Sequence, residues 1–116
     1  MRIVGATEYA LVLYRGKLPK FRNTDADGKR HMIFDHFDWV RDGGDIPKIH
    51  PSQKPVNLLK RLIEIFTDEG DVVIDPCAGS GSTLRAAREL GRNSYGFEVS
   101  REFYTKASEQ MLGGAG

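Results

Sequence analysis

The sequence predicts an α/β fold in which a mostly parallel sheet is flanked by helices. From Val56 onward, segments with helical spacing alternate with short apolar segments, in the order helix, strand, helix, strand, helix. This alternation is typical of parallel strands joined by helical connections. A glycine-containing loop from Cys77 to Gly81 also separates the first of these strands from the next helix. Strand–loop–helix units of this kind bind ligands at the carboxyl end of the strand.

Length and composition indicate one small globular domain. The chain has 116 residues, of which 40% are hydrophobic and 28% charged, and its formal net charge is +1. The single cysteine, Cys77, excludes an internal disulfide and indicates a reducing cytoplasm. No apolar run approaches the roughly 20 residues that span a bilayer, and no signal peptide is visible. We expect a cytoplasmic protein with a single domain over residues 1–112 and a flexible tail over 113–116.

The first half of the chain is less regular than the second. Residues 7–14 have the aromatic and aliphatic composition of a strand, and residues 15–17 are predicted to turn. Residues 15–49 combine prolines, glycines and aspartates without clear periodicity, which predicts a basic irregular loop region. Within that region, residues 32–40 are predicted to form either a strand or a loop anchored by its apolar side chains.

Residues 56–74 begin the regular half. Residues 56–66 place their apolar side chains on one face of a helix, with Pro55 near the first turn. Residues 72–74 form an uninterrupted apolar run, as expected of a strand buried on both faces.

The remaining elements follow from capping signals. A helix is predicted from Thr83 to Leu90, capped by Ser82 or Thr83 and closed by Gly91 in a left-handed conformation. Residues 94–97 read as a second strand. A last helix is predicted from its cap, Ser100, to about Met111. Three polar side chains in or just after the helix predicted from Thr83 to Leu90 are expected to face solvent: Arg88, Glu89 and Arg92.

Only two strands are clear in this half of the chain. A parallel sheet needs cover on both faces. We therefore expect the chain either to be part of a larger fold or to associate with another molecule through an exposed apolar sheet edge.

Two carboxylates follow the two predicted strands. Asp75 ends the first strand beside the glycine loop, where it suits a ligand with ammonium or hydroxyl groups; the alternative is a turn aspartate. Glu98 ends the second strand, where an acid in nucleotide-binding α/β folds receives ribose hydroxyls; the alternative is a solvent-facing glutamate. The combination with the glycine loop favours a ligand-binding role for Glu98.

The residues after the glycines narrow the class of ligand. A dinucleotide-binding fingerprint requires a third glycine at position 84, which is Leu84 here, so a dinucleotide-binding fragment is the weaker alternative. No phosphate-binding lysine follows the glycines, which excludes a P-loop. A ligand with a ribose, an amino-acid ammonium group and no phosphate fits better, and S-adenosylmethionine has these features.

Several segments resemble the DNA amino-methyltransferases, which methylate adenine N6 or cytosine N4. Asp75–Thr83 resembles their cofactor-binding motif, and His50–Pro55 resembles the segment that leads into the preceding helix. The resemblance covers nearly the whole chain from about Glu8 and implies a partial Rossmann-like fold of the S-adenosylmethionine-dependent methyltransferases. Further matching segments are residues 8–17 and 91–98, with Tyr104 and Ala107.

The resemblance implies a role for individual residues in holding S-adenosylmethionine. Asp75 and the backbone of residues 76–81 would hold the methionine part, and Glu98 would bind the ribose hydroxyls. Ser82 and Thr83 would lie near the cofactor carboxylate, where the helix dipole is favourable. Cys77 is interpreted as a small apolar pocket residue and not as a nucleophile. The full predicted set is Gln53, Lys54, Asp75, Pro76, Cys77, Gly79, Gly81, Ser82, Thr83 and Glu98.

The catalytic motif of the family is absent from this sequence. These enzymes carry an Asp/Asn/Ser-Pro-Pro-aromatic motif that hydrogen-bonds the target amino group and stacks on the flipped base. No two prolines are adjacent here. The resemblance therefore implies the cofactor-binding portion of a site-specific DNA methyltransferase that is inactive alone and needs a partner chain or a missing N-terminal part for activity. The expected partners are DNA and either a second polypeptide that carries the catalytic motif or a homo-oligomer. The alternative is a non-catalytic DNA-binding or partner-binding remnant of such an enzyme.

Basic residues gather in the irregular loop region. Between Arg15 and His31, six lysines and arginines stand against two aspartates. They are predicted to contact DNA phosphates without reading base sequence, with a solvated loop as the alternative. The aromatic residues of the region are interpreted as loop anchors in preference to wedges between bases, and the histidines lack metal-ligand spacing. The predicted DNA contacts are Arg15, Lys17, Lys20, Arg22, Lys29 and Arg30; the aromatic residues are Phe21, Phe34 and Trp39; the histidines are His31, His36 and His50.

Overall fold

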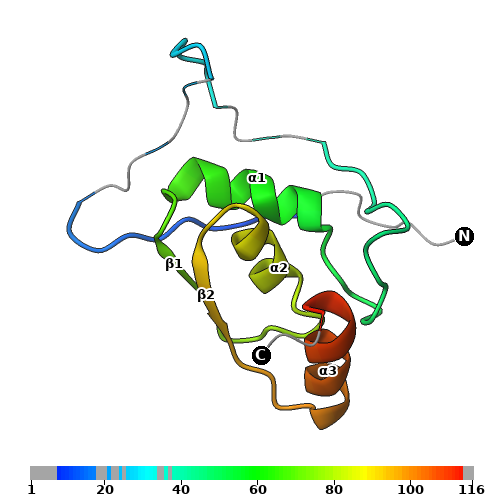
Figure 1. The fold of residues 1–116 in the computed structure, drawn as a ribbon. Helices are drawn as coiled ribbons and strands as arrows, with labels where there is room; N and C mark the ends of the chain where they lie inside the picture. The colour runs from blue at the N-terminus through cyan, green and yellow to red at the C-terminus, as the bar shows by residue number, and fades with distance from the viewer. Residues whose placement is uncertain are drawn as a thin grey trace, which may run out of the picture.

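The computed structural model describes residues 8–17, 21, 24, 26–33, 36 and 38–113. Within this part of the chain, two strands form a parallel sheet, and α2 packs against both of them and against α1 (Figure 1). The predicted α/β fold with flanking helices is therefore confirmed. The elements are α1 (Val56–Phe66), β1 (Val72–Asp75), α2 (Ser82–Glu89), β2 (Asn93–Gly96), α3 (Arg101–Lys106) and its continuation, the π-helix η1 (Ala107–Met111).

The hydrophobic core lies between α1, α2 and η1. It forms because the apolar face of α1 meets two alanines of α2, whose small side chains allow close approach. Val73 of β1 packs against the same cluster, as do Leu59, Leu90 and Phe103. No helix in the described part of the chain is long and apolar enough to cross a membrane. The buried members of the core cluster are Ile49, Val56, Ile63, Ala86, Ala87 and Met111.

The prediction that the first strand is buried on both faces is wrong. Val72 and Ile74 are 55% and 63% exposed, and Tyr95, which pairs with Ile74 in register, is 62% exposed. The reason is that α2 covers only the face that bears Val73 and Ser94. Among the described residues, nothing covers the opposite face, so its apolar side chains meet solvent.

The prediction of a strand over residues 7–14 is also wrong for the part that can be checked. Residues 8–14 form no strand and have no ladder partner in the described chain, and their side chains are exposed. Strand composition alone does not form a strand without an edge to pair with. Glu8 instead forms an ion pair with Lys54 at 2.8 Å. Thr7 lies outside the described residues.

The irregular region contacts both ends of α1. Phe21 packs edge-on against Phe66 with ring centroids 5.5 Å apart, as predicted for a loop anchor. Asp42 caps α1 by accepting hydrogen bonds from Val56 N at 2.9 Å and Asn57 N at 3.4 Å. This long-range cap replaces the side-chain cap that Pro55, the N-cap residue, does not provide.

The described part of residues 32–40 contains no strand. Its neighbour, a turn closed by a single antiparallel bridge between Thr24 and Arg30, stands away from the helices (Figure 1). Phe34 lies outside the described residues, and Trp39 is 45% exposed. Of the predicted tail, residues 114–116 also lie outside the described residues.

The capping predictions are partly confirmed. Gly91 has the expected left-handed φ of +73°, and Ser100 accepts a hydrogen bond from Phe103 N at 3.4 Å. The predicted capping of α2 by Ser82 or Thr83 is wrong, because Gly81 is the N-cap residue with φ +80° and no side-chain cap is present. The Ser82 hydroxyl is instead hydrogen-bonded to that of Ser80 at 2.8 Å.

Arg92 does not face solvent as predicted, whereas Arg88 and Glu89 are exposed. Arg92 is half-buried and donates hydrogen bonds to Thr67 Oγ1 and Thr67 O. Thr67 is the C-cap of α1, so the guanidinium satisfies a helix end that would otherwise lack a donor.

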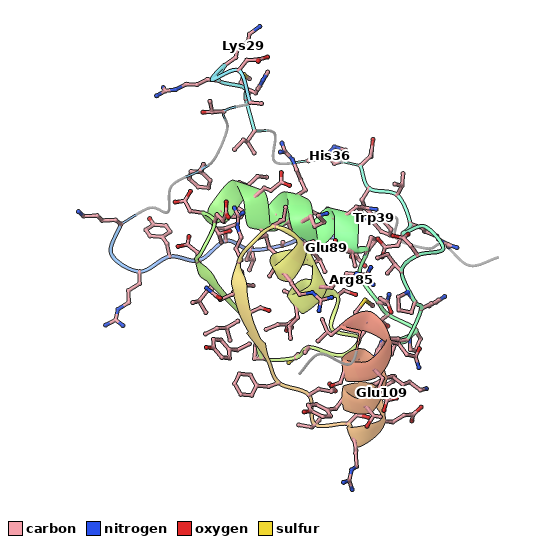
Figure 2. The ribbon with its side chains drawn as sticks, in the orientation of Figure 1. Lys29, His36, Trp39, Arg85, Glu89 and Glu109 are labelled. Atoms are coloured by element: carbon pink, nitrogen blue, oxygen red, sulfur yellow. The ribbon has the colours of Figure 1, made fainter. Side chains whose placement is uncertain are left out.

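Glu89 joins α1 to α2. Its carboxylate lies 3.3 Å from Lys60 Nζ and 3.3 Å from Arg85 Nε; Figure 2 shows Arg85 and Glu89 on α2. Burial raises the pKa of Glu89, but the hydrogen bonds and charges of Lys60 and Arg85 outweigh it and hold the pKa below its ordinary value. The stabilisation is therefore present above the ordinary carboxyl pKa and is lost as the pH falls through the lowered one.

Leu84 packs where a third glycine would stand in a dinucleotide-binding fold. A Cβ on Gly96 of β2 would lie 2.6 Å from Leu84 Cδ1 and 3.0 Å from Ala78 Cβ. Helix α2 can thus approach β2 closely because the glycine is on the strand and not on the helix.

We expect Gly96→Ala to destabilise the fold by about 1–3 kcal/mol, because the added methyl group overpacks the α2–β2 interface. The free energy of unfolding from urea denaturation measures this. Gly44→Ala is the matched control, since a Cβ there meets nothing within 4 Å. Equal stability of the two variants would contradict the close α2–β2 packing.

Candidate functional site

A cleft with a volume of about 290 Å³ opens beyond the carboxyl ends of β1 and β2. Its walls come from the loop after β1, the start of α2, the residue Glu98 after β2, and the segment that precedes α1. Among the ten residues predicted to hold a cofactor, only Pro76 and Gly81 do not line it. The predicted residues that do are Gln53, Lys54, Asp75, Cys77, Gly79, Ser82, Thr83 and Glu98.

Asp75 and Glu98 share this cleft because β1 and β2 are parallel and end at the same edge of the sheet. Both side chains are half-buried. Asp75 Oδ1 accepts a hydrogen bond from Cys77 N at 3.0 Å, so one oxygen serves the turn. Glu98 Oε2 accepts from Ser100 N at 3.4 Å. Each carboxylate keeps a second oxygen with which it can bind a ligand.

The loop after β1 is shaped by two left-handed glycines. Gly79 has φ +52° and Gly81 has φ +80°. The loop is tied to the end of β2 by Ala78 N, which donates to Phe97 O at 2.9 Å, and closed by Gly81 N, which donates to Ala78 O at 2.8 Å. Gly81 does not line the cleft because it faces η1, where Ala107 Cβ would lie 3.3 Å from an added Cβ.

Gln53 lines the cleft, but its side-chain amide forms hydrogen bonds with the backbone of its own loop. Its Oε1 accepts from Ile49 N at 2.9 Å, and its Nε2 donates to Pro47 O at 2.9 Å. The amide therefore holds residues 47–53 in place. Lys54, the next residue, puts a positive charge at the rim of the cleft, where it pairs with Glu8.

Sequence reasoning missed several lining residues. His50 belongs to the predicted segment but had no assigned role; its Nδ1 accepts from Ser52 N at 3.0 Å. Leu59 lines the cleft from α1, although helical periodicity assigns it to the core face and cannot separate a pocket wall from a core position. Ser80 belongs to residues 76–81, for which only a backbone role is predicted; its side chain is buried by the loop geometry, for which the sequence carries no separate signal. The other lining residues outside the predicted set are Ser52 and Ala78.

The predicted DNA-contacting residues that the structure describes do not line the cleft. Arg15, Lys17, Lys29 and Arg30 are exposed and do not line it. Lys29 stands near the tip of the turn that projects from the helices (Figure 2). Lys20 and Arg22 lie outside the described residues. No group of histidine, cysteine, aspartate and glutamate side chains in the described part of the chain could hold a metal ion.

Comparison with known proteins gives consistent matches. The family model for N6/N4 methyltransferases, described as DNA methylase, matches residues 4–109 of this chain. The type II methyltransferase M.MjaI of Methanocaldococcus jannaschii is 35% identical over 115 residues, which cover 90% of this chain and 38% of that protein. The type II methyltransferase M.HindIII of Haemophilus influenzae is 47% identical over 62 residues, which cover 53% of this chain and 20% of that protein.

Solved structures agree with these matches. The crystal structure of the M1.HpyAVI–SAM complex superimposes with a TM-score of 0.52 and 39% sequence identity, over 53% of this chain and 31% of that chain. The present chain thus spans between 20% and 38% of the lengths of the relatives it matches.

We expect Gln53→Ala to destabilise the protein by about 1–3 kcal/mol, because Ile49 N and Pro47 O would lose their partner in a partly buried loop. The free energy of unfolding in urea measures the loss. Ser52→Ala is the matched control, since this neighbouring side chain is exposed. If both variants unfold alike, the amide of Gln53 does not hold the loop.

Proposed function

The chain belongs to the N6/N4 DNA methylase family, and we propose that it binds S-adenosylmethionine in the cleft at the ends of β1 and β2. The observation that carries this proposal is the meeting of Asp75, Glu98 and the Gly79 loop in one cleft. M1.HpyAVI, to which this chain is similar, has been crystallised with SAM. The relatives are DNA methyltransferases, which supports the same cofactor here.

The donors and acceptors of the cleft fit this cofactor. S-adenosylmethionine carries an ammonium group, a carboxylate and a ribose diol. Asp75 complements the ammonium group, and Glu98 accepts hydrogen bonds from the diol. Ser82 and Thr83 stand at the first turn of α2, where the helix dipole favours the carboxylate, and Lys54 adds a positive charge at the rim.

We propose that the chain is the cofactor-binding portion of a DNA methyltransferase that acts on an exocyclic amino group, adenine N6 or cytosine N4. In this reaction the amino nitrogen forms a bond to the methyl carbon, the carbon–sulfur bond breaks, and the nitrogen loses a proton. The exposed basic residues Arg15, Lys17, Lys29 and Arg30 would contact DNA phosphates. Free Cys77 supports a reducing cytoplasm as the location.

A second polypeptide, or a segment of the protein outside this sequence, would supply the catalytic strand. Two observations support this: no two prolines are adjacent in the sequence, and the sheet face of Val72, Ile74 and Tyr95 lacks cover from the described residues. Large apolar side chains that share a surface favour burial against another chain. The uncovered sheet face also fits a homo-oligomer. The alternative function, favoured by the same missing motif, is a non-catalytic DNA-binding or partner-binding remnant.

We expect Glu98→Gln to weaken S-adenosylmethionine binding by about tenfold or more, because a charged acceptor for hydrogen bonds is lost. Isothermal titration calorimetry measures the dissociation constant. Glu109→Gln is the matched control, since Glu109 is an exposed glutamate of η1 that does not line the cleft (Figure 2). Binding of NAD without binding of S-adenosylmethionine would contradict the proposal.

We expect the chain alone to transfer no tritiated methyl group to unmethylated DNA, and transfer to appear when a polypeptide with a Pro-Pro-aromatic motif is added. Ile74→Glu should abolish the restored transfer, because it places a charge on the uncovered sheet face. Met32→Glu is the control, since Met32 is 75% exposed but lies in the irregular region. Transfer by the unaided chain would refute the need for a partner; no transfer with any partner would favour the remnant.

A further inference from the structure

The element formed by α3 and η1 touches both loops that make the cleft, although Phe103, Ala107 and Met111 do not line it. The first contact is through His50. The rings of Phe103 and His50 have centroids 4.4 Å apart and planes inclined by 47°. His50 Cδ2 also lies 3.9 Å from the position that a Cβ on Gly79 would occupy. His50 therefore packs between Phe103 and the glycine loop.

The second contact is directly behind Gly81. A Cβ on this residue would lie 3.3 Å from Ala107 Cβ and 3.8 Å from Met111 Cγ. Ala107 and Met111 are 8% and 1% exposed, so neither has room to move aside. Gly81 is the N-cap of α2 and holds a left-handed φ, so η1 packs against the point where the loop turns into the helix.

Two arginines of α2 form hydrogen bonds that fix the position of η1. Arg88 Nη1 donates to Leu112 O at 2.9 Å, and Arg85 Nη1 donates to Met111 O at 3.4 Å. These arginines satisfy carbonyl groups at the helix end, which would otherwise lack donors. The π-helical turn, with Leu112 N bonded to Ala107 O at 2.9 Å, brings Ala107 and Met111 together against Gly81. Single π-helical turns occur frequently at functional sites.

We propose that α3 and η1 set the width of the cleft, with Phe103 positioning the His50 loop and Ala107 with Met111 positioning the Gly81 turn. Phe103, Ala107 and Met111 are thus positioning residues, since each acts through a loop residue. A cleft whose walls shift by a fraction of an ångström loses the geometry that its ligand needs. This inference rests on the proposed function for its ligand, but the contacts themselves can be tested without one.

The test compares Phe103→Ala with Tyr104→Ala in the full chain. The two residues are adjacent aromatics of α3, but Phe103 is half-buried and Tyr104 is 60% exposed. Nuclear magnetic resonance of the ligand-free protein reports the His50 ring and the Gly79 amide, and calorimetry reports the dissociation constant for S-adenosylmethionine. Phe103→Tyr keeps the ring and should restore both readouts. Phe103→Leu keeps most of the apolar volume and replaces Phe103→Ala if that variant unfolds.

We expect Phe103→Ala to shift the His50 and Gly79 signals and to weaken binding about tenfold, whereas Tyr104→Ala changes binding less than about twofold. Unchanged His50 and Gly79 signals would overturn the inference, as would shifted signals with unchanged binding. If the wild-type chain binds no S-adenosylmethionine, the proposed function fails, while the His50 and Gly79 signals still decide whether Phe103 positions the loop.

Discussion

The parallel pairing of β1 with β2 is the constraint on which the site depends. In this register Asp75 stands opposite Gly96, so the two strands end together and the chain leaves both at the same edge. Asp75 and Glu98 therefore reach one cleft although they are far apart in sequence. An antiparallel pairing would place the two acids at opposite edges. Gly96 allows the pairing to coexist with close packing of α2, because Leu84 occupies the space that a Cβ would fill.

Polar side chains hold several of the segments that connect the helices and strands. Gln53 bonds to the backbone of its own loop, Asp42 caps α1 from the irregular region, and Arg92 satisfies the end of α1. These side chains satisfy backbone groups that have no partner within a helix or strand. Among these contacts, those of Gln53 lie in a segment that lines the cleft, where the apolar contacts of Phe103, Ala107 and Met111 act beside them.

The uncovered face of the sheet is consistent with the greater length of the relatives in the family. An apolar strand next to solvent is unfavourable, and the matched parts of this chain cover only 20% of M.HindIII and 38% of M.MjaI. The same strand residues alternate between the two environments: Val73 packs toward α2, whereas Val72 and Ile74 point to the other side. The alternation is a consequence of strand geometry and not of the sequence, which is apolar at all three positions.

The sequence by itself determined the type and order of the elements after Val56. It also identified most of the residues that line the cleft, because helical spacing, glycine turns and acids at strand ends are local signals. The tertiary structure alone decided which contacts cross the chain. It showed that residues 8–14 pair with no strand in the described part of the chain, that Asp42 caps α1, that Gln53 bonds to its own loop, and that Gly81 faces η1. Each of these depends on which distant residue lies within a few ångströms, and local periodicity carries no information about that distance.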